Sequence, residues 1–335
     1  MAVGWNDICV LMADGNVRCK QDWRPDGVRR LGSFIAVSGA DHVAEIAAGH
    51  HHACARTTSG GVLCWGRNDS GETSGDDVVV RSARAVTLPS PAVEVRVGES
   101  ESCARLATDA VFCWGRVANV DHAPATPIDW FAHTAGLALS ADALCAHDAA
   151  GLLRCSFAGG KPLEPVAGPV TSIALGRYRG CALMADGTVR CFALSLPADA
   201  PVSAKVPPWA EPVEGVTDAV QVVAGTAHFC ARRRDGTASC WGSNNYGQLG
   251  NGTRDASSSA SPVKNLVDAV ELSAGGDRGC ARRSAGVIVC WGADLLADAL
   301  FGALTGLHVD PGPPGPNDSL RPEELRVPIS YEVNR

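Results

Sequence analysis

The sequence predicts an all-β protein folded as a seven-bladed β-propeller with four-stranded blades. Two cysteines separated by nine residues recur seven times, and these pairs account for all 14 cysteines of the 335-residue chain. A glycine stands five residues before the first cysteine in six of the seven units, and an apolar residue stands eight residues before it in all seven. Each unit therefore predicts a strand, a bend, a second strand, a tight turn, a third strand and a weaker fourth strand.

A four-stranded unit is too small to bury a core of its own, so all seven units are needed for one ring. We therefore expect residues 1–335 to form a single domain. The repeats lie at about 1–41, 42–91, 92–132, 133–169, 170–217, 218–267 and 268–335.

The first unit has an Asp14-Gly15 turn between its cysteines, but Lys20 stands where other units have tryptophan. Exposed sheet edges invite association, so the ring must close. Residues 327–331, Val-Pro-Ile-Ser-Tyr, resemble the Pro-Val strand of other units. We therefore expect the C-terminus to supply the outermost strand of the blade that holds the N-terminal strands.

The next four units differ in how closely they follow the repeat. The second carries three histidines, 50–52, after Gly49, and the third carries a Trp-Gly pair after its second cysteine. The fourth is the most degenerate, with Ser140 in place of the glycine. The fifth continues into a proline-rich stretch, 197–212, that predicts an extended and exposed loop.

The sixth unit is the best copy, and the seventh carries an insertion. In the sixth, Asp235-Gly236 predicts a tight turn that places Cys230 opposite Cys240. In the seventh, apolar residues recur at helical spacing over 294–307 and predict a short helix. It could cover one face of the ring or dock a partner; we favour the first, because an apolar stripe usually faces its own core.

The cysteine pairs predict seven disulfides within blades. Opposed residues on antiparallel strands lie close enough for a bridge, and pairing without a remainder is typical of a disulfide framework. The alternative is that the cysteines are reduced and act as small core residues. Metal sites favour closer pairs than these, so we expect no metal ligands. The predicted pairs are Cys9 with Cys19, Cys54 with Cys64, Cys103 with Cys113, Cys145 with Cys155, Cys181 with Cys191, Cys230 with Cys240, and Cys280 with Cys290.

Disulfides indicate an oxidising compartment, so we expect a secreted, periplasmic or cell-envelope protein. The chain shows no signal peptide, and we expect a natural precursor to carry a preceding segment or the chain to be a trimmed piece. It has no run of 18 apolar residues, which excludes a helical membrane span. The net charge of −7 and the lack of a basic stripe argue against nucleic acid. We expect a monomer without a cofactor.

The residues between the glycine and the first cysteine differ strongly from unit to unit, while the flanking residues repeat. Loops held on a rigid scaffold suit recognition, and Trp, Tyr and Arg are typical interface anchors. The alternative is that they are solvated turn residues, and that His52 and His228 make only repeat-type hydrogen bonds. The predicted binding residues are Trp5, His51, Glu99, Glu101, Arg177, Tyr178, Arg179, His228 and Arg278.

The sixth unit also carries a family resemblance. Its run Cys-Ala-x-x-x-Asp-Gly-x-x-x-Cys-Trp-Gly-x-Asn-x-x-Gly-Gln-Leu-Gly-x-Gly-Thr, preceded by Gly225-Thr-Ala-His228, resembles the repeat of the regulator of chromosome condensation family. The resemblance covers essentially the whole chain and implies a seven-bladed propeller. The cysteine pairs resemble those of bacterial, often secreted, members.

Three functions known in that family give different expectations here. Nucleotide exchange on a small GTPase goes with a basic chromatin-binding tail in the nuclear member, which this acidic chain lacks. The plant ultraviolet-B photoreceptor has clustered tryptophans after the glycine, and only Trp5 occupies that place here. A secreted bacterial member inhibits β-lactamase by covering its active site with loops on one face. That mode is the most similar, so we expect a protein-binding module.

Two alternatives remain from other classes. The first is an enzyme, a lyase or hydrolase with a site at the mouth of the central channel, where Glu99 and Glu101 could act as an acid/base pair. The second is a structural fragment of a larger envelope protein. Histidines 50–52 could ligate a metal, but adjacent side chains point in different directions, so we expect none.

Overall fold

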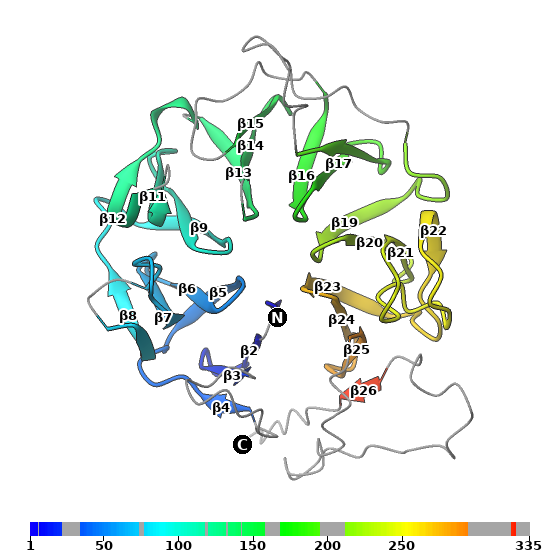
Figure 1. Cartoon of the computed structure of the whole chain (residues 1–335), viewed down its shortest axis with the longest axis horizontal. Helices are drawn as coiled ribbons and strands as arrows, with labels where there is room; N and C mark the ends of the chain where they lie inside the picture. The colour runs from blue at the N-terminus through cyan, green and yellow to red at the C-terminus, as the bar shows by residue number, and fades with distance from the viewer. Residues whose placement is uncertain are drawn as a thin grey trace, which may run out of the picture.

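The computed structural model describes residues 1–5, 7–21, 34–73, 77–117, 120–131, 133–141, 143–157, 168–194, 212–293 and the strand at 323–325. Seven antiparallel sheets follow one another around a ring, with the first strand of each next to the centre (Figure 1). The described residues contain one short 3-10 helix, η1 (Asp129–Phe131), and no α-helix. The prediction of an all-β, seven-bladed propeller is confirmed.

The blades are numbered 1 to 7 in chain order. Blade 1 holds β1 (Ala2–Val3), β2 (Asp7–Leu11), β3 (Val17–Gln21) and β4 (Ile35–Ala36). Blade 2 holds β5 (Val43–Ala48), β6 (His52–Thr57), β7 (Val62–Arg67) and β8 (Val79–Val86). Blade 3 holds β9 (Ala92–Val97), β10 (Glu101–Leu106), β11 (Val111–Val117) and β12 (Val120–Pro127). Blade 4 holds β13 (Thr134–Leu139), β14 (Ala143–Asp148) and β15 (Leu153–Phe157). Blade 5 holds β16 (Val170–Leu175), β17 (Arg179–Met184) and β18 (Val189–Ala193). Blade 6 holds β19 (Ala219–Ala224), β20 (His228–Arg233), β21 (Ala238–Gly242) and β22 (Ser257–Pro262). Blade 7 holds β23 (Ala269–Gly275), β24 (Arg278–Arg283), β25 (Ile288–Gly292) and β26 (Glu323–Leu325).

Five of the seven blades show the expected four strands among the described residues, whereas the expectation about ring closure needs correction. Blades 4 and 5 show three strands among the described residues, with one further bridge between Arg190 and Pro212. The outer position of blade 1 is taken by β4, from the first unit itself, and β26 pairs with β25 in blade 7. A C-terminal strand is therefore not needed to complete blade 1. Residues 327–331 and the expected helix at 294–307 lie outside the described residues.

Blade 1 closes the ring directly against blade 7. The backbone N–H of Val3 donates to Ser273 Oγ in β23 at 3.0 Å. A hydrophobic cluster joins Val3 and Ile8 to Cys280 and Ile288. Contact between the first and last blades buries the sheet faces that an open ring would expose.

The hydrophobic core is divided among the seven interfaces between neighbouring blades. Each described cluster draws side chains from two adjacent blades; one, for example, joins Val189 of blade 5 to Val222 and Trp241 of blade 6. This is the packing expected of units that cannot bury a core alone.

Seven disulfides connect the second and third strands within the blades, as the cysteine spacing predicts. Their Cα atoms are 3.9–4.1 Å apart, and every pair occupies directly opposed positions in the ladder. Each cysteine is at most 8% exposed. All fourteen cysteines are paired.

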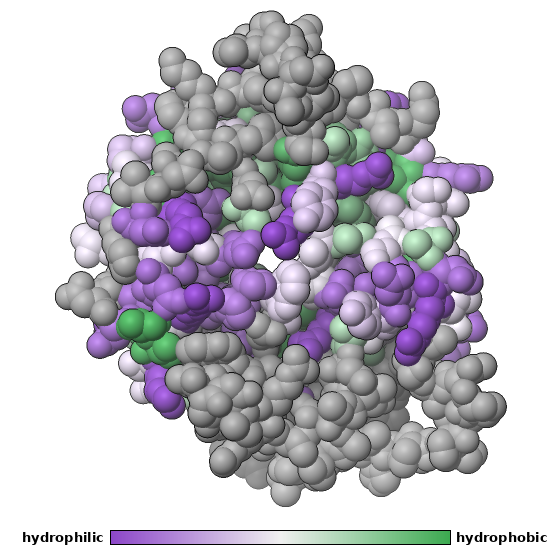
Figure 2. All heavy atoms as spheres, viewed as in Figure 1, coloured by the Kyte–Doolittle hydropathy of each residue, from purple (hydrophilic) through white to green (hydrophobic). Residues whose placement is uncertain are grey.

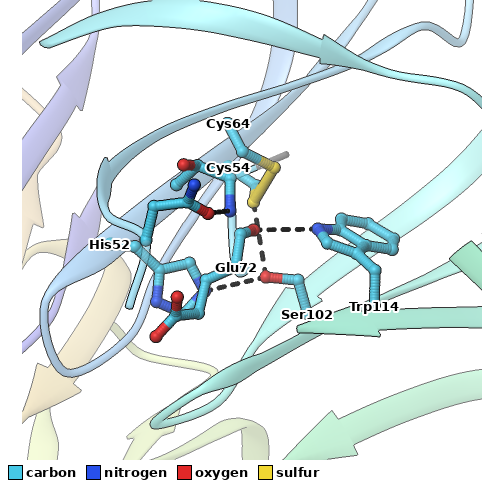
Figure 3. The surroundings of a disulfide bond; sticks show 8 residues. His52, Cys54, Cys64, Glu72, Ser102 and Trp114 are labelled. Atoms are coloured by element: carbon cyan, nitrogen blue, oxygen red, sulfur yellow. Dashed lines mark hydrogen bonds between the residues drawn. A yellow bond between two sulfur atoms is a disulfide. The ribbon is translucent and has the colours of Figure 1, made fainter. Parts of the chain in front are cut away.

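Polar contacts between blades surround these bridges. Beside the Cys54–Cys64 disulfide, the imidazole Nε2 of His52 lies 2.8 Å from Ser102 Oγ of the next blade (Figure 3). In the same region, Trp114 Nε1 donates to the backbone oxygen of Glu72 at 2.9 Å. Neighbouring blades are thus joined by hydrogen bonds as well as by apolar packing. The helix in the described part of the chain, η1, has three residues, so no described helix is a candidate membrane span.

Candidate functional site at the mouth of the channel

The bends between the first and second strands lie side by side around the centre of the ring. Each is closed by a backbone hydrogen bond, such as Gly49 N–H to His52 O at 2.9 Å and Gly176 N–H to Arg179 O at 2.9 Å. We call the side of the ring that carries them the bend face. The bends begin at Gly4, Gly49, Gly98, Ser140, Gly176, Gly225 and Gly275.

Backbone hydrogen bonds also connect neighbouring bends. The residue after the glycine donates to the next bend in Trp5 N–H to Gly49 O at 3.0 Å and in Arg177 N–H to Thr226 O at 2.8 Å. The backbones approach so closely that a Cβ atom at Gly49 would lie 2.0 Å from the oxygen of Gly98. Glycine is required there because the neighbouring blade occupies the space of a side chain. The bends therefore form a fixed frame for the side chains that follow them.

A cavity of about 150 Å³ opens between the bends, and three residues of every blade line it. These are the glycine position and the residue on either side of it. We call the residue after the glycine position the mouth residue of each blade. Those mouth residues are Trp5, His50, Glu99, Ala141, Arg177, Thr226 and Gly276. In the face viewed in Figure 2, hydrophilic side chains gather on both sides of the middle of the ring.

Aromatic and histidine side chains meet at the bends of blades 1 and 2. Trp5 and His50 meet edge to face, with ring centroids 4.4 Å apart, and His50 and His51 have centroids 4.1 Å apart. Burial lowers the pKa of His50, and it lowers the pKa of His51 to about 4. Both imidazoles are therefore neutral at pH 7. The 3.9 Å separation of His50 Nδ1 and Glu99 Oε1 is then no ion pair.

The bend of blade 5 presents an exposed Arg-Tyr-Arg sequence. Tyr178 is 62% exposed, and Arg177 and Arg179 are also exposed. The guanidinium carbon of Arg177 lies 5.6 Å from the centroid of the Tyr178 ring, a cation–π contact. Within the described part of the chain, neither guanidinium lies at ion-pairing distance from a carboxylate. The backbone is anchored by Leu194 N–H, which donates to Tyr178 O at 2.9 Å.

Arg67 and Arg116 lie on the same face but, unlike Arg177 and Arg179, each forms an ion pair with a carboxylate. They follow the Trp-Gly pairs of blades 2 and 3, and their backbone N–H groups donate to bend oxygens, which places them beside the bends. Arg67 pairs with Asp69, and Arg116 pairs with Asp121 at 2.7 Å. Blade 5 therefore differs from blades 2 and 3 in leaving its positive charge uncompensated within the described residues.

Two of the predicted binding residues are buried in the structure. His228 is fully buried, and Arg278 is only 9% exposed, with its Nε donating to the backbone oxygen of Ala293 at 3.3 Å. Both are the first residue of a second strand, β20 or β24, and both are buried there. Burial lowers the pKa of His228 to about 4, so its imidazole is neutral. Neither side chain is presented on the bend face.

The remaining predicted residues stay accessible to different degrees. Trp5, Arg177, Tyr178 and Arg179 are exposed, while His51, Glu99 and Glu101 are half-buried. Glu101 begins β10, whereas Glu99 lines the mouth. The accessible part of the predicted site therefore lies in the bends of blades 1, 2, 3 and 5.

Ser140 is a residue at the mouth that the sequence did not predict as a site residue, although it is the one departure from the bend glycine. Ser140 replaces the bend glycine of blade 4, lines the cavity and is 8% exposed. Its hydroxyl has no hydrogen-bond partner among the described residues. The departure from glycine was the available signal. In the described part of the chain, no group of three or more His, Cys, Asp or Glu residues gathers in a way that could hold a metal ion.

Comparisons with family models identify the repeat in three blades. A model described as the Regulator of chromosome condensation (RCC1) repeat matches residues 43–72 and 219–248. A second model of the same description matches residues 235–281. These segments lie in blades 2, 6 and 7, and they support the family resemblance read from the motifs. No curated protein has a significant sequence match to this chain.

Solved structures share the fold at low sequence identity. Human WBSCR16 is 19% identical, with 82% of this chain and 83% of that chain covered and a TM-score of 0.67. Prp20p from Saccharomyces cerevisiae, described with its binding properties to Gsp1p and histones, is 18% identical, with coverage of 82% and 80% and a TM-score of 0.68. The CRINKLY WD40 ectodomain of the Arabidopsis thaliana receptor kinase ACR4 is 20% identical, with coverage of 88% and 97% and a TM-score of 0.56. At these identities the likeness shows the propeller fold.

Proposed function

We propose that this propeller is a protein-interaction module that binds its partner through the bend face. The observation that carries the proposal is the contrast between fixed backbone and variable side chains at the seven bends. Hydrogen bonds within and between blades hold the backbone, while the mouth residues run from tryptophan to glycine. A rigid frame with varied loops is the arrangement that recognition surfaces use, because little ordering is lost on binding.

The exposed side chains on this face are of the kinds that anchor protein interfaces. Tyr178 is 62% exposed and Trp5 is 37% exposed, and two arginines flank the tyrosine. Trp, Tyr and Arg dominate binding energies when a partner covers them. The binding of Gsp1p and histones by Prp20p, a propeller of the same fold, agrees with this use of the scaffold.

The enzymatic alternative has less support. Of the expected acid/base pair, Glu99 lines the cavity at the mouth, whereas Glu101 begins β10 and does not line it. Seven buried disulfides are in keeping with a secreted or periplasmic module, since such bonds persist in oxidising compartments. We further propose that the module acts as a monomer and does not bind nucleic acid.

Site-specific photo-crosslinking tests the proposal. A benzophenone amino acid replaces Tyr178 on the bend face or, as the control, Val267, which is 63% exposed at the opposite end of β23. Both variants are irradiated in secreted and periplasmic extracts of the source organism, and the adducts are identified by mass spectrometry. We expect one protein to be captured from position 178 and not from position 267. Capture of the same proteins in equal yield from both positions would contradict a binding site on this face.

A further inference from the structure

We infer that the bend of blade 5 recognises an acidic segment of the partner, with a carboxylate received by Arg177 and Arg179 at the mouth of the channel. The inference rests on the proposed function and specifies the chemistry of the partner at one point of the bend face. It depends on three observations: a pair of arginines uncompensated within the described residues, a polar wall of the mouth in the neighbouring blade, and an exposed tyrosine between the arginines.

The arginine pair is the first observation. Arg177 and Arg179 project from a bend whose backbone is held by hydrogen bonds to its own blade and to the next. Arg67 and Arg116 on the same face already have acidic partners, so they contribute less to attraction of an anion. The chain as a whole carries a net charge of −7, so this pair is a local positive site on an acidic protein. Arginine suits carboxylates because its planar fork donates two parallel hydrogen bonds.

The hydroxyl of Ser140 is the second observation. Arg177 and Ser140 belong to neighbouring blades and line the same cavity. The serine side chain is more than nine-tenths buried, and its Oγ has no hydrogen-bond partner among the described residues. An unsatisfied buried polar group costs free energy. The wall of the mouth next to blade 5 therefore holds a polar group without a partner among the described residues.

The size of the mouth and the exposed aromatic ring favour a protein segment as the source of the carboxylate. The cavity volume of about 150 Å³ lies below the roughly 300–1,000 Å³ of pockets that enclose a free small molecule. It therefore admits the end of one side chain. Tyr178 offers a flat apolar surface beside the arginines, which suits the apolar neighbours of an acidic residue in a polypeptide.

Selection from a displayed library of random dodecapeptides on the immobilised full chain tests this inference. The selected peptides are then made with a fluorescent label, and their Kd values are measured by anisotropy. The test variant is Arg177→Ala/Arg179→Ala. The control is Arg81→Ala/Arg234→Ala, which removes the same charge from exposed positions in β8 and in the turn after β20.

We expect the selected peptides to be rich in Asp and Glu, and their Asn and Gln analogues to bind at least about tenfold more weakly. The test variant should bind the acidic peptides about tenfold or more weakly than the wild type, and the control variant less than about twofold more weakly. The melting temperatures of both variants should be unchanged. Affinity should also fall as the salt concentration rises, because the site is exposed.

Other results overturn the inference. Undiminished binding of acidic peptides by the test variant would remove the arginines from recognition. Selection of peptides without acidic residues, with binding lost in Trp5→Ala, would reject the acidic segment while leaving a binding bend face in place. Failure to select any peptide, or binding of heparin through the two arginines in place of peptides, would reject a linear acidic segment as the ligand. The crosslinking experiment decides the proposed function separately, because it requires no particular partner chemistry.

Discussion

Removal of one disulfide from blade 6 tests the account of how the blades are stabilised. In Cys230→Ala/Cys240→Ala, the bond between β20 and β21 is lost, but the hydrogen bonds of the ladder remain. Both cysteines are at most 1% exposed and pack among the apolar residues of the interface with blade 7.

The size of the effect follows from the length of the closed loop. The two cysteines are separated by 10 residues, for which the loop-entropy relation gives a loss of about 3 kcal/mol in the free energy of unfolding. The small cavity left by two buried sulfur atoms adds to this loss. The disulfide between Cys145 and Cys155 in blade 4 closes a loop of equal length. Replacing both of these cysteines by alanine should therefore cost the same entropic part of the free energy of unfolding.

Equilibrium unfolding in urea, followed by tryptophan fluorescence under non-reducing conditions, measures both variants. We expect each midpoint to fall by an amount equivalent to about 3 kcal/mol or more, with the slope nearly unchanged. A loss below about 1 kcal/mol in both variants would refute the loop-entropy reasoning. A large loss in one blade alone would show that local packing, and not loop closure, determines the effect.

Three further predictions concern the bends and the buried histidines. Gly49→Ala places a Cβ atom 2.0 Å from the oxygen of Gly98, so we expect a loss of about 2 kcal/mol or more and a lower melting temperature; an unchanged value would show that the blades can separate. Ser102→Ala removes the hydrogen-bond partner of the buried His52 imidazole and should cost about 1–3 kcal/mol in urea unfolding, whereas a neutral result would mean that the contact contributes nothing. The pKa of His228 is about 4 when folded against an ordinary 6.5, so its contribution to stability is full above pH 6.5 and is lost as the pH falls towards 4. The melting temperature of the wild type should therefore fall more steeply over that range than that of His228→Gln, and parallel curves would contradict this.

The repeat pattern predicted the strands and the disulfides because both depend on neighbours along the chain. Cys54 and Cys64 belong to one hairpin, and a separation of ten residues around a tight turn brings them opposite each other. The glycine and the apolar residue of each unit are likewise set by the geometry of a single blade. The variable residues after the glycine were predicted to form a rim for the same reason, and the mouth residues of all seven blades do meet there.

Burial and pairing on the bend face required the tertiary structure. His228 was predicted to bind a partner, with a repeat-type hydrogen-bonding role as the alternative, and its side chain is fully buried. The outer strand of blade 1 is the two-residue β4, which is too short to show a pattern in the sequence.

The sequence by itself determined the number of blades, the pairing of the cysteines and the position of the variable rim. Only the tertiary structure decided that Arg177 and Ser140, from different blades, line one cavity, and that the bend of blade 5 carries unpaired charge within the described residues. The physical reason is distance along the chain. Contacts inside a blade join residues about ten positions apart and leave a periodic trace, whereas contacts between blades join residues some 40 to 50 positions apart and leave none.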